Sequence, residues 1–155
     1  MLDRIDAVRW SDYAQPEWNK PGSMVHALAG VVRGESSAYD SLIYAVGNNH
    51  AGTYYPVVLA VMPFLAEILD AGEVSSQRIA LDVLVDLFGS FEPESGYEEV
   101  DAPAGGKRSV EAAFAERMHA LRPALERIAA DGGSNASLAE ELSRLVSEDD
   151  VRSGG

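Results

Sequence analysis

Along most of the chain, apolar and polar residues recur with the period of an α-helix. Apolar residues three or four positions apart fall on one face of a helix, so each such run predicts a helix with one buried side. Serines near the starts and glycines at the ends mark the boundaries of several runs. The pattern predicts helices over 23–33, 37–46, 56–71, 76–88, 109–130 and 137–147.

Two segments depart from this one-sided pattern. Residues 76–88 are apolar almost all round, which is typical of a mostly buried helix. Residues 90–107 combine prolines and glycines with carboxylates, and they predict a long acidic loop. Because no stretch shows the sustained alternation of a β-strand, we predict an all-α protein.

Length and composition fit a single domain. The chain has 155 residues, 46% of them apolar, which is enough to bury one core. We place that domain at 1–147, with the acidic loop insertion at 90–107 and a flexible C-terminal tail at 148–155. The chain has no cysteine and its N-terminus is charged where a signal peptide would be apolar, so we expect a cytoplasmic protein. The longest apolar run, 54–66, is too short for a membrane span.

Parts of the sequence repeat, and a repeat changes the expected architecture. Three pairs of segments match each other: Leu28–Val32 with Leu65–Leu69, Leu42–Gly47 with Leu84–Gly89, and Pro63–Ile68 with Pro123–Ile128. These matches predict three helical hairpins stacked as a short solenoid.

The central hairpin, over residues 55–90, resembles a HEAT repeat. Such repeats have a proline in the first helix, an aspartate near its end and an arginine opening the second, and Pro63, Asp70 and Arg78 occupy those places. The resemblance implies a short α-solenoid of about three HEAT-like antiparallel hairpins, whose second helices line a concave face. Asp70 and Arg78 are then expected to pair across the turn, unless Arg78 pairs with Asp82 on its own helix.

The turn between the second and third predicted helices adds to this resemblance. It reads His50-Ala51-Gly52-Thr53-Tyr54-Tyr55 and is similar to a turn in small bacterial HEAT-type proteins, although Gln often stands there in place of Ala51. Lysine is scarce beside abundant alanine, glycine and aspartate, which is typical of a GC-rich genome such as that of an actinobacterium.

The net charge of the chain favours some classes of binding partner over others. The formal charge is −13, from 25 acidic and 12 basic residues. Contacts from Lys and Arg to phosphates supply most of the affinity for nucleic acid, so this balance argues against such a ligand. The same charge attracts a basic partner, although it would also serve solubility alone.

The region from 44 to 55 holds the densest group of polar and aromatic residues: Tyr44, Asn48, Asn49, His50, Tyr54 and Tyr55. His50 is a candidate base because an imidazole titrates near neutrality, but no nucleophile motif lies near it. In the alternatives, the polar side chains satisfy the ends of the flanking helices, or the group contacts a ligand or partner.

Asp82 and Asp86 lie one turn apart on one helix face, where two carboxylates suit a metal ion or an arginine of a partner. No histidine has matching spacing, so we expect no metal, and no cofactor motif is present. We assign both aspartates to the partner-binding surface.

We therefore predict a non-catalytic protein-interaction module, an acidic HEAT-like solenoid that binds a basic protein partner, of the immunity or adaptor type. Nucleic acid, membranes and cofactors are not expected. The alternative is a small hydrolase-type enzyme or a ligand-binding protein that uses His50 with Asp82 and Asp86. That alternative requires the three side chains to converge in one pocket.

Overall fold

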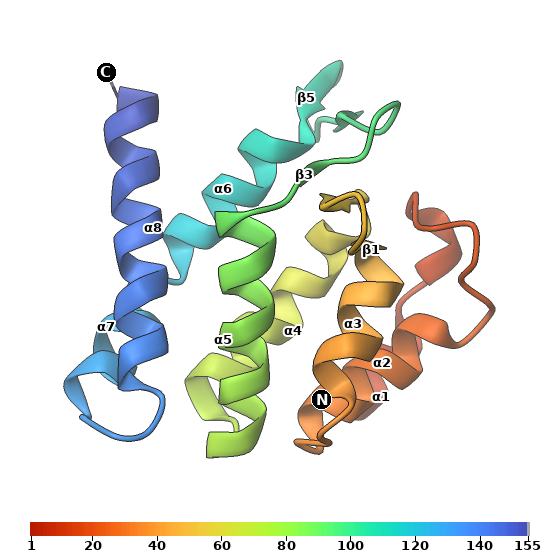
Figure 1. Cartoon of the computed structure of the whole chain (residues 1–155). Helices are drawn as coiled ribbons and strands as arrows, with labels where there is room; N and C mark the ends of the chain where they lie inside the picture. The colour runs from red at the N-terminus through yellow and green to blue at the C-terminus, as the bar shows by residue number, and fades with distance from the viewer. Residues whose placement is uncertain (155) are drawn as a thin grey trace.

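The computed structural model describes residues 1–154 and is mostly helical, as predicted (Figure 1). Its helices are α1 (Leu2–Ala7), the 3-10 helix η1 (Trp10–Asp12), α2 (Ser23–Val32), α3 (Ala38–Val46), α4 (Val58–Ala71), α5 (Val74–Gly89), α6 (Val110–Ala120), α7 (Arg122–Ala130) and α8 (Ala136–Gly154). Its strands are β1 (Gly47–Asn48), β2 (Thr53–Tyr54), β3 (Glu92–Pro93), β4 (Glu99–Asp101) and β5 (Lys107–Ser109). None of the helices within residues 1–154 combines the length and the apolar character that a membrane span requires.

The helices form two layers. Helices α3, α5 and α8 lie side by side in one layer, and α5 contacts both of the others (Figure 1). Behind them, α2 packs against α3, α4 against α5 and α7 against α8, while α6 packs against α4. Consecutive helices therefore pair across the two layers, α2 with α3, α4 with α5 and α7 with α8.

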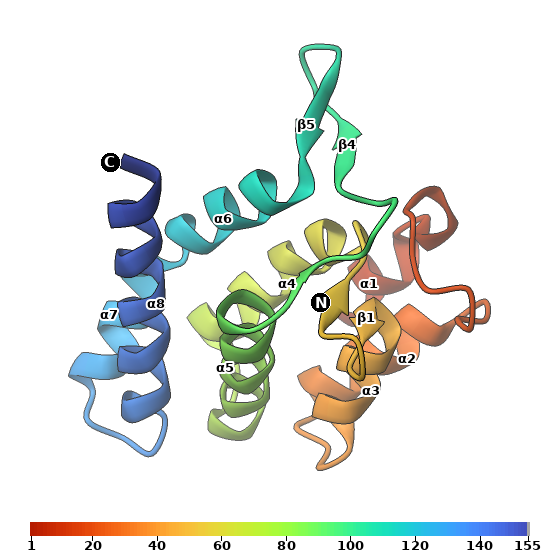
Figure 2. The ribbon, with the colours of Figure 1, turned by 45° about the horizontal axis from the view of Figure 1, so that its top comes forward.

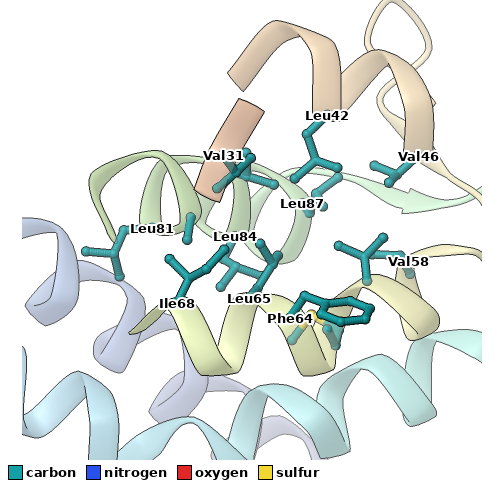
Figure 3. Close-up of a cluster of buried hydrophobic side chains, with 14 of the residues drawn as sticks. Val31, Leu42, Val46, Val58, Phe64, Leu65, Ile68, Leu81, Leu84 and Leu87 are labelled. Carbon is teal, nitrogen blue, oxygen red and sulfur yellow. The ribbon is translucent and has the colours of Figure 1, made fainter. Parts of the chain in front are cut away.

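The core fills the space between the two layers. Leu65 and Ile68 lie three residues apart on α4, as do Leu81 and Leu84 on α5, so each pair projects from one face of its helix. These side chains are almost inaccessible to solvent and belong to one continuous cluster. Figure 3 labels its central members: Val31, Leu42, Val46, Val58, Phe64, Leu65, Ile68, Leu81, Leu84 and Leu87.

The helix predicted over 109–130 is in fact two helices, α6 and α7, which meet at Leu121. Proline has no N–H for the preceding turn, and its ring clashes with the carbonyl four residues earlier, so a helix rarely continues through it. Pro123 instead occupies the first turn of α7, where its missing N–H would have had no helical acceptor.

The helix predicted over 137–147 is longer in the structure, because α8 continues to Gly154 through most of the predicted tail at 148–155; residue 155 lies outside the described residues. Side-chain contacts hold this extension. The His119 ring on α6 lies 2.9 Å from a carboxylate oxygen of Asp149 and 3.2 Å from one of Asp150. A local sequence pattern does not reveal such contacts between distant helices.

Short strands correct the all-α prediction, including its irregular loop at 90–107. Strand β1 pairs antiparallel with β2, β2 pairs parallel with β3, and β4 pairs antiparallel with β5. Each strand has only two or three residues, too few for an alternating pattern to be visible in the sequence.

One of the two predicted ion pairs of Arg78 forms. Arg78 lies 3.5 Å from Asp82 on its own helix. Asp70 does not pair with Arg78; it accepts a hydrogen bond of 2.9 Å from Arg127. Because α4 also packs against α7, the end of α4 offers Asp70 a partner that the sequence pattern of one hairpin cannot indicate.

Candidate functional site

The C-terminal end of helix α3 fixes the segment that precedes α2 in the chain. The last carbonyls of a helix have no partner within the helix and need donors from elsewhere. The indole N–H of Trp18 donates to the carbonyl of Tyr44 at 2.8 Å, and the side-chain amide of Asn19 donates to that of Ala45 at 2.7 Å. These two bonds place the Trp18 ring beside the exposed Tyr44 side chain.

The chain then reverses in the hairpin between β1 and β2. The side-chain oxygen of Asn48 accepts hydrogen bonds from the backbone N–H groups of His50, at 3.0 Å, and Ala51, at 3.1 Å. Gly52 has a φ of 67°, in the left-handed region that glycine adopts readily, and donates its N–H to the Asn48 carbonyl at 2.8 Å. Asn48 thus stabilises its own turn. Within residues 1–154 the His50 ring makes no hydrogen bond.

A cleft of about 430 Å³ lies beside this turn. It is lined by Trp18, Asp40, Ile43, Tyr44, Gly47, Asn48, Asn49 and His50, and we call it the His50 cleft. Asp40 is its carboxylate, and its lining contains no Lys or Arg. Ser, Thr and Cys are also missing from the lining, so His50 has no serine, threonine or cysteine nucleophile to activate there.

Four aromatic rings, which we call the aromatic row, run from this cleft toward β4. Trp18 contacts Tyr44 with 5.6 Å between ring centroids and Tyr55 with 6.4 Å. Tyr55 in turn contacts Tyr97 at 4.9 Å. The two ends of the row are open to solvent, since Tyr44 is 61% and Tyr97 40% exposed.

Carboxylates flank the aromatic row. Burial raises the pKa of the Tyr55 phenol, and the nearby carboxylates of Glu94 and Glu17 raise it further. Thr53 donates its hydroxyl hydrogen to Glu94 and thereby orients it. Within residues 1–154, Glu17, Asp40 and Glu94 form no salt bridge. Their charge is therefore available to a cation from outside.

The structure does not bring every predicted site residue into this region. Tyr54 is only 2% exposed and packs its ring against Phe114, and burial raises the pKa of its phenol. Tyr54 therefore serves the core.

The two aspartates of α5 also lie apart from this region. Asp82 is paired with Arg78, and neither Asp82 nor Asp86 lines the His50 cleft.

Asp86 accepts a hydrogen bond from the phenol of Tyr39 on the neighbouring helix α3. The pKa of Tyr39 is raised by burial first and by this bond to Asp86 second. The contact joins α3 to α5, so Asp86 contributes to helix packing.

Of the predicted residues, Tyr44, Asn48, Asn49 and His50 share the cleft, and Tyr55 lies in the aromatic row. Sequence reasoning missed Trp18 and Asn19, which lie in a proline-flanked segment without periodicity. A Trp–Asn pair outside any helix is one signal that could have indicated donors for a helix end.

No family model, no curated protein and no solved structure matches the chain. Within residues 1–154, no three or more His, Cys, Asp or Glu side chains gather closely enough to hold a metal ion. The chemistry that the region offers is that of aromatic faces and carboxylates beside a cleft whose lining has no Lys or Arg, an arrangement that suits a bound cation.

Proposed function

We propose that the protein is a non-catalytic interaction module whose aromatic row and flanking carboxylates bind a basic segment of a partner protein. In this proposal the helix pairs α2–α3, α4–α5 and α7–α8 act as a short HEAT-like solenoid that presents the surface. The observation that carries the proposal is the aromatic row itself, open at both ends and flanked by three carboxylates that form no salt bridge within residues 1–154.

An arginine side chain suits this surface better than any other. Its guanidinium group stacks on aromatic faces while its N–H groups pair with a carboxylate. A cation over an exposed aromatic ring gains about 0.5–1 kcal/mol. Because one such contact is weak, useful affinity requires several basic residues along the row. The net charge of −13 would speed their approach.

The enzyme alternative lacks a comparable observation. It requires His50, Asp82 and Asp86 to converge, and the two aspartates do not line the cleft of His50. The immunity or adaptor role remains one form of the proposal, because both act by holding a partner protein.

The proposal is tested by calorimetric titration with short oligo-arginine, oligo-lysine and oligo-glutamate peptides. We expect oligo-arginine to bind most tightly and oligo-glutamate not at all. Asp40→Asn should weaken oligo-arginine binding about five- to tenfold, and Tyr44→Ala by a similar factor.

Asp131→Asn is the matched control. Asp131 is an exposed carboxylate at the end of α7, on the opposite side of the molecule from α3 in Figure 1, so this variant loses the same charge away from the site. It should change the affinity less than twofold. Equal losses for Asp40→Asn and Asp131→Asn would mean that net charge alone holds the peptide, and the proposed site would be wrong.

A further inference from the structure

A second cleft lies under the β4–β5 hairpin, which stands away from the helices in Figure 2. This hairpin cleft has a volume of about 660 Å³ and is bounded by the hairpin, residues 8–14 and the first half of α4. Leu59, Pro63 and Phe64 of α4 and Val100 of β4 give it an apolar lining. Its charged side chains have both signs, so charge alone selects no ligand there.

Strand β4 presents one unpaired edge, because β5 is its only strand partner within residues 1–154. Val110 donates its N–H to the carbonyl of Glu98, and Ala102 donates to that of Gly106, both at 2.9 Å. Backbone groups in an antiparallel pair alternate between facing the partner strand and facing away from it. The N–H and C=O groups of the residues between these bonded positions, 99 and 101, therefore point away from β5.

The outward N–H groups of β4 are free to pair in the part of the chain that the structure describes. The N–H groups of Glu99 and Asp101 donate to no backbone carbonyl elsewhere within residues 1–154. An exposed strand edge of this kind pairs readily with an added strand. Both residues also line the hairpin cleft, so a strand added there would lie against its apolar wall.

Pro63 adds a further acceptor. In a regular helix the N–H of residue 63 would donate to the carbonyl of Leu59, but proline has none. This carbonyl therefore lacks its usual helical donor, and both Leu59 and Pro63 line the hairpin cleft. The cleft thus combines apolar surface with backbone donors and acceptors, which is what an extended peptide requires.

The aromatic row connects the two clefts. Trp18 and Tyr44 line the His50 cleft, and Tyr97, at the far end of the row, lines the hairpin cleft. The contacts along the row are 5.6, 6.4 and 4.9 Å between centroids. A strand rises about 3.3 Å per residue, so about five extended residues cover the row.

We infer that the partner's bound segment is an extended peptide that adds to the edge of β4, with alternate apolar residues in the hairpin cleft and a basic residue in the His50 cleft. This inference rests on the proposed function and gives the partner segment its conformation and its sequence pattern. The edge of β4 supplies hydrogen bonds, the apolar wall selects alternate residues, and Asp40 with the aromatic row selects the cation.

The probe is a synthetic peptide of alternating valine and threonine followed by two glycines and two arginines. Calorimetry should give a Kd at least tenfold lower than that of oligo-arginine of equal charge. Methylating the peptide nitrogens that face β4 should cost at least tenfold in affinity, because it removes strand pairing. Methylating the nitrogens on the other edge should cost less than twofold.

Protein variants give the complementary test. Glu99→Pro removes one outward N–H, which an edge strand tolerates, and should weaken probe binding at least tenfold. Glu99→Gln removes the same charge, keeps the N–H and should change the affinity less than twofold. Neither variant should alter oligo-arginine binding.

The outcomes separate the two proposals. If oligo-arginine binds through Asp40 but the probe gains nothing over it, strand addition is wrong and the proposed function stands. Equal effects of the two methylation patterns, or of Glu99→Pro and Glu99→Gln, also overturn strand addition. If neither peptide binds, both proposals are wrong.

Discussion

Replacing Pro63 with alanine should stabilise the protein. Pro63 lies in the interior of helix α4 and is exposed to solvent. There it leaves the carbonyl of Leu59 without its helical donor. An alanine at this position restores that hydrogen bond without removing a side chain from the core.

The magnitude follows from two opposing terms. A proline in a helix interior costs about 3 kcal/mol relative to alanine. Proline also restricts the unfolded chain, so its removal costs about 1 kcal/mol. We therefore expect Pro63→Ala to raise the free energy of unfolding by about 2 kcal/mol. For a chain of this size, that gain raises the Tm by about 4–8 °C.

Urea titration and thermal melts followed by circular dichroism measure the effect. The control is Pro103→Ala, because Pro103 lies at the second position of a turn in which Gly105 donates its N–H to the Ala102 carbonyl at 3.0 Å. Proline suits that position, so its removal should leave the Tm unchanged or slightly lower. An equal shift for both variants, or a lower Tm for Pro63→Ala, would refute the helix-interior argument.

Three further predictions concern the core, the end of α3 and the C-terminal helix. Leu84→Ala should lower the free energy of unfolding by about 3 kcal/mol in urea titration, because Leu84 is fully buried; a loss under 1 kcal/mol would contradict its central place in the core. Trp18→Phe keeps a ring but removes the bond to the Tyr44 carbonyl, so a loss of about 1 kcal/mol is expected in thermal melts, and an unchanged Tm would show that the bond contributes nothing. A hydrogen bond from Arg122 holds the pKa of Asp150 below its usual range, so this contact stabilises the fold fully above about pH 4 and is lost progressively as the pH falls through the lowered pKa. Asp150→Asn should therefore be less stable than the native chain at pH 7 and by a smaller margin at pH 3, and an equal difference at both values would rule out this linkage.

Local patterns predicted most helices because their apolar residues repeat every three or four positions. The predicted boundaries of α2 and α3 lie within a residue or two of those observed. Where a predicted helix boundary was wrong, the cause was a single residue or a tertiary contact, which leaves no periodic pattern in the sequence. Pro123 divided one predicted helix, and contacts of His119 with two carboxylates accompany the extension of another.

The candidate site was harder to predict than the fold. The polar turn around His50 is visible in the sequence, but its neighbour Trp18 is distant in the chain and is held by a carbonyl at the end of α3. Asp86 seemed available from its helical spacing alone, yet Tyr39 on another helix donates a hydrogen bond to it. Availability of a side chain depends on tertiary partners, which spacing along one helix does not specify.

Pro63 links stability to the proposed binding surface. A residue that costs stability on an exposed helix face, where alanine would fit, is most readily explained by a role outside folding. Because Leu59 lines the hairpin cleft, we expect that restoring the helical donor of its carbonyl removes an acceptor from an added strand. Pro63→Ala should therefore raise the Tm and weaken the valine–threonine probe about fivefold, with oligo-arginine binding unchanged. A variant that gains stability and keeps full affinity for the probe would mean that the carbonyl takes no part in peptide binding.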